Sequence, residues 1–328
     1  MYIKRRYGLS MIIKWTFTAL TVSLLYSGLV VALGYYLYKY HEINISIAWQ
    51  PVSILGTAVA FYLGFKNNAS YDRLWEARKI WGSIVNNSRP FAAQLIAYTK
   101  GNNQNEIVSE IIHRHIAWLT ALRYQLRLEK EWEHTEERLN NIFVPNICEL
   151  YYTKLDEELM SCISDEAFEK YKNKSNLATH IMLTQSKRLQ ELRDQEYFED
   201  FRHMELQKII HNFYEDQGKS ERIKTFPFPR QYASIALWLT LFFAVLTPFG
   251  IMDVFMDRIW LTIPLSTLII WVFYLMEKIG DYSENPFEGT YNDVPITSIS
   301  NTIEIDLKEM INNHSIPSKT EPVNGFLM

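Results

Sequence analysis

The sequence INISIAWQPVSILGTAVAFYLGFKNNASYDRLWEARKIWG, residues 43–82, decides how the chain is interpreted. Its first part, residues 43–65, has no formally charged side chain, whereas its second part, from Lys66 onward, is rich in charged, amide and aromatic side chains. No turn cluster separates the two parts. Because a membrane span needs about 20 apolar residues, we predict one long helix that crosses a membrane and continues into water. Such a helix is able to line a pore.

Three further stretches are uncharged and long enough to span a membrane: residues 15–38, 231–252 and 259–276. Together with residues 43–65 they predict an all-α protein with four spans, grouped as residues 15–65 and 231–278. We expect its long helices to extend into a cytosolic helical domain, and several copies to assemble as a ring around a central pore.

The remaining segments are predominantly polar. Residues 66–230 show apolar side chains at three- and four-residue steps and no sustained alternation, which predicts a soluble helical domain. We expect residues 1–14 and 279–311 to be short cytosolic segments and residues 312–328 to be a disordered tail. Lys and Arg are concentrated beside the predicted domain and the N-terminus, so both termini are expected in the cytoplasm of a cell with this protein in its inner membrane.

Composition and motifs exclude several classes of protein. The net charge is -4 and the pI is about 6.1, so the chain has no bias towards nucleic acid. We find no nucleophile elbow, no glycine-rich phosphate loop and no paired-cysteine metal motif. The sequence therefore predicts neither an enzyme nor a protein with a cofactor.

Two faces of the second span are distinguished by four-residue spacing. One face carries a hydroxyl and two aromatic rings: Thr57, Phe61 and Phe65. The adjacent face carries only small residues, which let a neighbouring helix approach closely: Gly56, Ala60 and Gly64. Considered alone, the aromatic face is more simply a part of the bundle core.

The run from Ser53 to Gly82 resembles the pore-helix signature of the bestrophin family, and its bacterial branch has a very similar run through GFKNNASYDR and EARKIWG. A second match is ENPFE, residues 284–288, and a weaker one is DLKEM, residues 306–310. The resemblance covers about residues 10–312, although the middle matches only as a helical pattern. It implies a homopentameric ion channel in a lipid bilayer.

The resemblance also implies two constrictions of the pore. The family's hydrophobic neck is formed at three positions spaced by four, which correspond here to Thr57, Phe61 and Phe65. A second constriction, the cytosolic aperture, is formed by an apolar residue of a central helix. Ile181 is the best match, with His180 and Leu177 as alternatives.

The sequence predicts the pore more narrowly than the ion that passes through it. Members of the family with aromatic necks pass chloride. Ring edges of Phe61 and Phe65 turned to the pore axis would favour anions, whereas ring faces turned to the axis would favour cations. Bacterial members with aliphatic necks are linked to monovalent cations, which leaves a cation channel of the same architecture as the alternative. Calcium-gated relatives have an acidic run after Asn-Pro-Phe. Only Glu288 and Asp293 remain acidic here, which argues against a calcium site.

A second alternative is a membrane-anchored helical metalloprotein. The pairs Glu110 and His113, and Glu131 and His134, have the spacing found in di-iron helix bundles. That spacing is common in charged helices, and Glu131 and His134 lie within EKEWEHTEER, which is typical of a solvated surface. The sequence therefore favours surface residues over metal ligands at both pairs.

Overall fold

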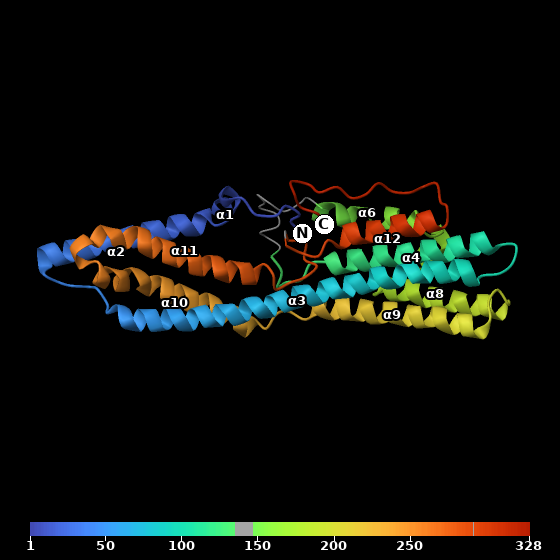
Figure 1. Ribbon diagram of the computed structural model, residues 1–328, viewed down its shortest axis with the longest axis horizontal. Coiled ribbons are helices and arrows are strands. Elements are labelled where there is room, and N and C mark those ends of the chain that lie inside the picture. Colours follow the sequence, from blue (N-terminus) through green and yellow to red (C-terminus); the bar gives the residue numbers. More distant parts are fainter. Residues whose placement is uncertain (135–146, 291) are drawn as a thin grey trace. The chain divides into compact units, whose positions relative to one another are not determined.

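The computed structural model describes residues 1–134, 147–290 and 292–328. Over these residues the chain forms helices joined by turns, and its β-type pairing is limited to two isolated bridges near the chain ends. The all-α prediction is therefore confirmed for the described part of the chain (Figure 1).

The described chain divides into two compact units. The first comprises Lys4–Arg73 and Pro227–Glu284, and we call it the membrane unit after the apolar helices that it contains. The second comprises Met1–Ile3, Leu74–Phe226 and Asn285–Met328, and we call it the core unit.

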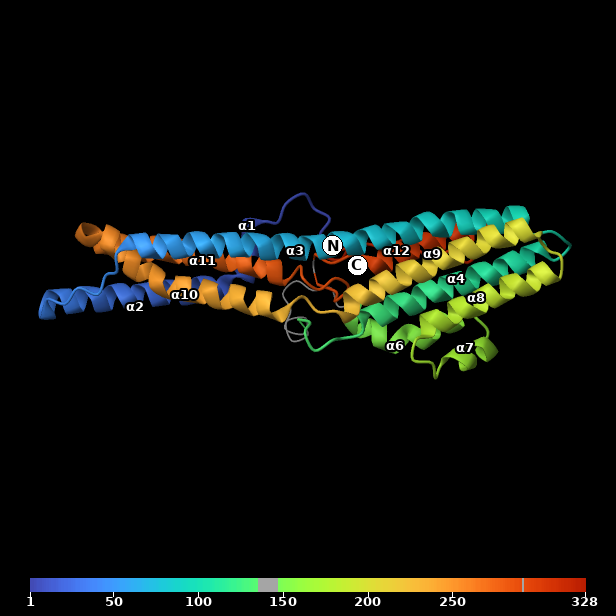
Figure 2. The same cartoon turned by 90° about the horizontal axis from the view of Figure 1, so that it is seen from below.

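The membrane unit contains six helical segments: α1 (Leu9–Trp15), α2 (Phe17–His41), the first part of α3 (Trp49–Tyr98), α10 (Arg230–Val254), the 3-10 helix η1 (Met256–Leu261) and α11 (Thr262–Asp281). Figures 1 and 2 show α10 beside the first part of α3, and α11 packs against both α10 and α2. Among the described residues, α2, α10 and the segment of η1 and α11 are long and apolar enough to cross a membrane. Helices suit lipid because they satisfy their own backbone hydrogen bonds.

The second predicted span begins later than the sequence indicated. Its helix, α3, begins at Trp49 rather than at Ile43, and Pro51 lies in the first turn, where a missing N–H is tolerated. Before the helix, the backbone N–H of Ser46 donates to Asn44 Oδ1 at 2.9 Å. This local bond competes with helix formation and accounts for the later start.

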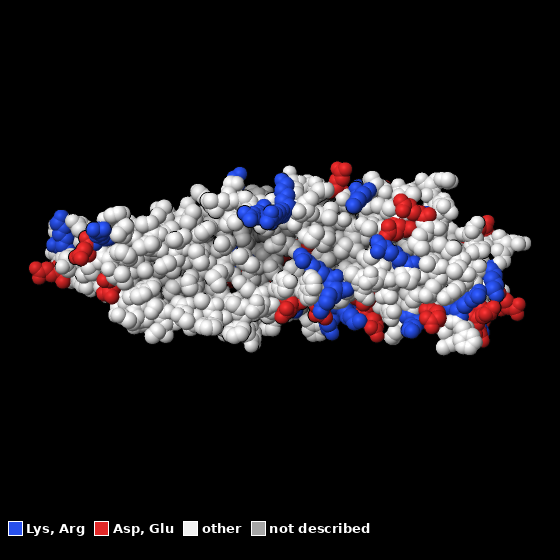
Figure 3. All heavy atoms as spheres, in the orientation of Figure 1, with Lys and Arg blue, Asp and Glu red and all other residues white. Residues whose placement is uncertain are grey.

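The interior of the membrane unit is apolar where α3 meets α10. Val52, Val59 and Leu63 of α3 are buried together with Ala236 and Phe243 of α10. On the face drawn in Figure 3, charged side chains are sparse over α2, α10 and α11. Both observations fit helices that are surrounded by lipid rather than water.

Over its described residues, the core unit is built from the second part of α3 and six further helices: α4 (Gln104–Arg127), α6 (Ile147–Met160), α7 (Asp165–Tyr171), α8 (Leu177–Asp194), α9 (Asp200–Thr225) and α12 (Ile296–Met310). α4 packs against α6, α8, α9 and α12. The apolar residues at helical spacing that predicted this unit form its interior.

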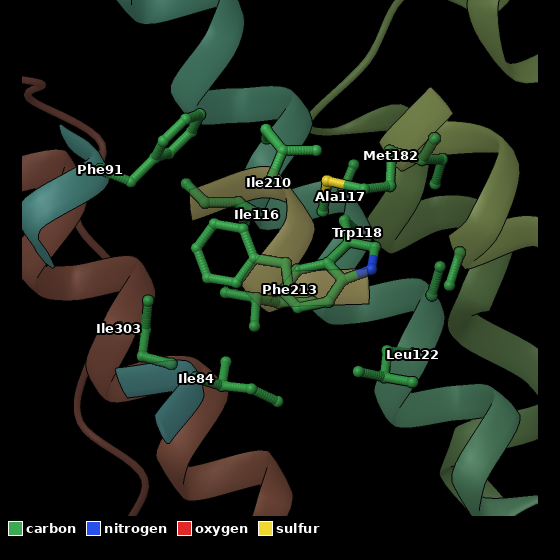
Figure 4. Packing of buried hydrophobic residues seen from close by; sticks show 14 of the residues in the cluster. Ile84, Phe91, Ile116, Ala117, Trp118, Leu122, Met182, Ile210, Phe213 and Ile303 are labelled. Atoms are coloured by element: carbon green, nitrogen blue, oxygen red, sulfur yellow. The ribbon is translucent and has the colours of Figure 1, made fainter. Parts of the chain in front are cut away.

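Trp118 and Phe213 pack against each other in the core unit, among aliphatic side chains such as Ile116 (Figure 4). His115 lies among them with no exposed surface, 4.6 Å from Phe213 and 5.5 Å from Phe91 between ring centroids. Its Nε2 is 2.9 Å from Ser88 Oγ. Burial lowers the pKa of His115 to about 3, so the imidazole is neutral at physiological pH.

The C-terminal tail is ordered against the core unit, in contrast to the disorder that we predicted for residues 312–328. Phe326 is buried and pairs with Tyr2 in an isolated antiparallel bridge. The N–H of Leu327 donates to the carbonyl of Met1 at 2.8 Å, and the N–H of Ser298 donates to that of Met328 at 2.8 Å. Apolar residues at the end of a polar segment hold it in place.

Candidate functional site

One face of α3 in the membrane unit is largely exposed. Phe61 and Phe65 are 68% and 67% exposed, and Ile54, two turns before Phe61, is 71% exposed. The opposite face carries the buried Val59 and Leu63. The helix therefore buries one side within its own chain and presents apolar side chains on the other.

The exposed face follows the seven-residue pattern of a helix that packs against copies of itself. Its residues, all exposed, are Ile54, Ala58, Phe61, Phe65, Asn68 and Asp72, and we call them the α3 stripe. Sequence reasoning named Phe61 and Phe65 but missed Ile54 and Ala58. The seven-residue spacing from Ile54 to Phe61 and from Ala58 to Phe65 was the signal that would have identified them.

Thr57 is also exposed, at the margin of the α3 stripe. Its Oγ1 donates to the carbonyl of Ser53 at 3.0 Å, one turn back along the helix. The hydroxyl is therefore satisfied by its own helix and presents mainly its methyl group outward.

The small residues of α3 differ from one another in their surroundings. A Cβ at Gly56 would lie 2.7 Å from the ring of Phe243 on α10, so this glycine permits the approach of the two helices. A Cβ at Gly64 would meet nothing within 4 Å. Ala60 is partly exposed. Within the chain, close packing is thus concentrated at Gly56.

An ion pair fixes α3 directly after Phe65. Lys66 Nζ lies 2.8 Å from Glu277 Oε1 of α11, and the two side chains are 0% and 5% exposed. The next residue, Asn67, donates from Nδ2 to the carbonyl of Met276 at 3.0 Å. These bonds set the rotation of α3 relative to α11, and with it the direction in which the α3 stripe faces.

Ile181, the residue expected at the cytosolic aperture, is in the wrong place for that role. It has no exposed surface and belongs to the hydrophobic cluster of the core unit. A pore constriction requires a side chain that reaches the aqueous path. The alternatives Leu177 and His180 are partly exposed, and Leu177 also packs against the cluster.

Two other residues of the core unit have the exposure that an aperture needs. Phe201 is 83% exposed and Met204, one turn later on α9, is 65% exposed. Sequence reasoning missed both because they stand within EDFRHMEL, where charged neighbours hide a short apolar stripe.

The two acidic residues of the possible calcium site bind groups of the chain instead. Asp293 accepts from Arg127 Nη1 at 2.6 Å and from the backbone N–H groups of Phe287, Gly289 and Val294 at 2.8, 2.7 and 2.6 Å. Both side chains of the Arg127 pair are almost completely buried.

Glu288, fully buried, lies 3.0 Å from His134 Nδ1. Within the described ranges no cluster of three or more His, Cys, Asp or Glu residues could hold a metal ion. A calcium site between Glu288 and Asp293 is not supported by this geometry.

The pairs of the metalloprotein alternative are occupied by other partners. Glu110 forms ion pairs with Arg114 at 2.7 Å and Arg188 at 3.1 Å, and these arginines hold the pKa of Glu110 below its usual value against the opposing effect of burial. His113 Nδ1 is 2.7 Å from the carbonyl of Ser109. His134 contacts Glu288 rather than Glu131. The described residues therefore give no support to a di-iron centre.

Comparison with known proteins adds an independent result. A family model described as bacterial/fungal bestrophin protein matches residues 7–309. The "voltage-dependent anion channel-forming protein YneE" of Escherichia coli O157:H7 is 28% identical over 283 residues, covering 86% of this chain and 83% of that protein. The "voltage-dependent anion channel-forming protein RSc3414" of Ralstonia nicotianae is 25% identical over 274 residues, covering 84% and 81%.

The fold is shared with solved structures as well. A bacterial bestrophin homolog from Klebsiella pneumoniae has a TM-score of 0.77 and 24% sequence identity, over 91% of this chain and 99% of that one. At this identity the likeness concerns the fold.

Proposed function

The chain belongs to the bacterial and fungal bestrophin family, and from that premise we propose that it forms an ion channel for small monovalent ions with chloride preferred. The observation that carries the proposal is the apolar part of the α3 stripe, from Ile54 to Phe65, a helix face in the membrane unit that stays exposed in the described chain. The named function of the similar proteins, anion channel formation, supports the choice of ion. The proposed activity is conduction, without catalysis.

The α3 stripe supports an assembly of several copies. Lipid tails are as apolar as phenylalanine, so burial alone does not drive Phe61 and Phe65 together; the small residues beside them, Ala58 and Gly64, are not covered in the single chain and permit the close approach of a neighbouring helix. Cyclic symmetry brings the same helix of every copy to one axis. We propose a homopentamer, the number implied by the family, with α3 at the centre.

The neck of this pore consists of Phe61 and Phe65, preceded by Thr57 at its margin. A narrow ring of apolar side chains excludes ions by dewetting and conducts when it widens. Aromatic edges carry partial positive charge, and edges turned towards the axis favour an anion. This is the physical basis for preferring chloride at the neck.

A second constriction is proposed at Phe201 in place of Ile181. Phe201 is the most exposed of the large apolar residues that the structure describes, and it begins α9 of the core unit. One such ring per copy supplies an apolar aperture of the kind that the family uses. Met204 continues the same face by one turn.

The membrane placement follows the distribution of basic residues. We propose four spans, the fourth being the first part of α3, in a bacterial inner membrane with both termini in the cytoplasm. This orientation is supported by Lys66 and Arg73, which follow the membrane part of α3, by Arg230 at the start of α10, and by the basic residues before α2.

The test is a bilayer recording of the purified protein under a KCl gradient. We expect a reversal potential near that of chloride in the wild-type protein. Phe61→Ala and Phe65→Ala should each raise the conductance and weaken the preference, because a wider neck stays wet. Phe201→Ala should raise the conductance and leave the preference for chloride unchanged.

Phe242→Ala is the matched control. Phe242 is a phenylalanine of α10 that is 58% exposed, but it lies outside the α3 stripe. It should leave both conductance and reversal potential unchanged. A reversal potential near that of potassium in the wild-type protein would establish the cation alternative, and equal currents in all four variants would remove the neck and the aperture from the mechanism.

A further inference from the structure

Asp72 is the charged residue of the α3 stripe. It follows Phe65 by seven residues on the same helix, which is close to two full turns, so the two side chains leave the same face. The rise of an α-helix places Asp72 about 10 Å along the axis from Phe65. Asp72 is exposed, as are the other members of the stripe.

Two basic side chains near Asp72 in sequence are engaged elsewhere. Lys66 is buried in its ion pair with Glu277 at 2.8 Å. Arg73 donates from Nε to the carbonyl of Glu284 at 2.9 Å. Among the residues that the structure describes, Asp72 takes part in no ion pair. Its carboxylate is therefore an unpaired negative charge beside the neck, and the exposed Lys79 lies about 10 Å further along the helix.

We propose that Asp72 sets the charge selectivity of the pore, acting against the preference of the aromatic neck. The inference rests on the proposed function, because only a ring of copies turns one exposed carboxylate into a ring of carboxylates. Rings of Asp or Glu concentrate cations and repel anions in channels. The permeability ratio then reflects two opposed elements on one helix: Phe61 and Phe65 favour chloride, and Asp72 limits the chloride entering from its side.

The distance between Asp72 and Phe65 predicts that the permeability ratio depends on the salt concentration. The Debye length is about 8 Å at physiological ionic strength and about 3 Å at 1 M, whereas Asp72 lies about 10 Å from Phe65 along the helix. The carboxylate ring thus affects ions at the neck in dilute salt and is screened in concentrated salt. A purely steric or aromatic filter would show no such change.

The experiment measures the chloride-to-potassium permeability ratio of the purified channel in bilayers. Asp72→Asn removes the charge and keeps the shape. It should raise the ratio by roughly two- to tenfold, the size expected for two charges about 10 Å apart in water or near a protein surface. The increase should be larger in dilute than in concentrated KCl. Asp72→Glu, which keeps the charge, should behave as the wild type.

Lys79→Gln is the matched comparison, since Lys79 is exposed on α3 another seven residues along and carries the opposite charge. This substitution should leave the chloride-to-potassium permeability ratio unchanged or lower it. An unchanged ratio in an Asp72→Asn channel that conducts normally overturns the inference and leaves the proposed function standing. Absence of any wild-type current overturns both.

Assembly is checked for each variant by native mass spectrometry. Asp72→Asn should have the wild-type number of copies. If it dissociates while Lys79→Gln does not, the carboxylate joins neighbouring copies, and the inference about selectivity is wrong.

Discussion

At the scale of single residues, His115 shows what burial does to a titratable side chain. Its ring is enclosed by aromatic rings, and one nitrogen has Ser88 as its partner. Burial penalises the charged imidazolium and so lowers the pKa of His115 to about 3, compared with about 6.5 in an unfolded chain. His115 is a structural residue whose charge state is tied to folding.

The shift predicts how stability depends on pH. Between about pH 6.5 and pH 3 the unfolded chain binds a proton at His115 and the folded chain does not, so the free energy of unfolding falls as the pH falls, by up to about 1.4 kcal/mol per pH unit. In the His115→Gln variant this contribution is absent. Thermal unfolding in detergent from pH 7 to pH 5 should therefore show a shallower slope for His115→Gln than for the wild type.

The control for this measurement is His211→Gln. The side chain of His211 is 71% exposed, so its replacement should leave the wild-type slope in place. Identical slopes for the wild type and His115→Gln would show that His115 is not the source of the pH dependence of stability.

At the scale of elements, α3 and α10 meet through a glycine. The ring of Phe243 occupies the space where a Cβ at Gly56 would lie, whereas the surroundings of Gly64 are open. Two glycines that look alike in the sequence therefore have different consequences for packing.

Alanine at each position tests this difference. Gly56→Ala forces the Phe243 ring to move, and overpacking of this kind costs about 1–3 kcal/mol. Gly64→Ala should be neutral or stabilising within the chain, because alanine favours helix by up to about 1 kcal/mol over glycine. Thermal unfolding of the purified proteins measures both. Equal destabilisation by the two substitutions would contradict the packing described here.

The same comparison shows which features of the elements were predictable. The long uncharged and periodic runs were enough to find the helices, whereas the exposure of Phe61 and Phe65 was expected only from the family resemblance, because the pattern alone favoured a buried aromatic face. Ile181 was assigned to the aperture from the resemblance, and its burial follows from the contacts of α8 with α4 and α9. The start of α3 was misplaced for a local reason, the bond from Ser46 to Asn44.

At the scale of the whole molecule, the question is what controls conduction. Asp293 already has a buried guanidinium and three backbone N–H groups as partners, and Glu288 has His134. A calcium ion would have to displace these groups. The carboxylates that remain are also fewer than the several that calcium usually requires.

We therefore expect the current to be independent of micromolar calcium. The measurement compares bilayer currents in a calcium chelator with currents in the same concentration of chelator saturated with calcium. The two should be equal. A current that disappears in the free chelator and returns with calcium would show that conduction requires calcium. The ion pair of Arg127 and Asp293 would then not take the place of a bound calcium ion.

The pairing of the first and last residues has a consequence for engineering the gene. Because Ile3 donates to Gly325 at 3.0 Å and Leu327 donates to Met1 at 2.8 Å, a short linker is able to join residue 328 to residue 1. The turn at Gly101, between α3 and α4, is exposed and offers a place to open new ends. A circularly permuted gene of this design makes the helix of the α3 stripe the last to leave the ribosome instead of among the first.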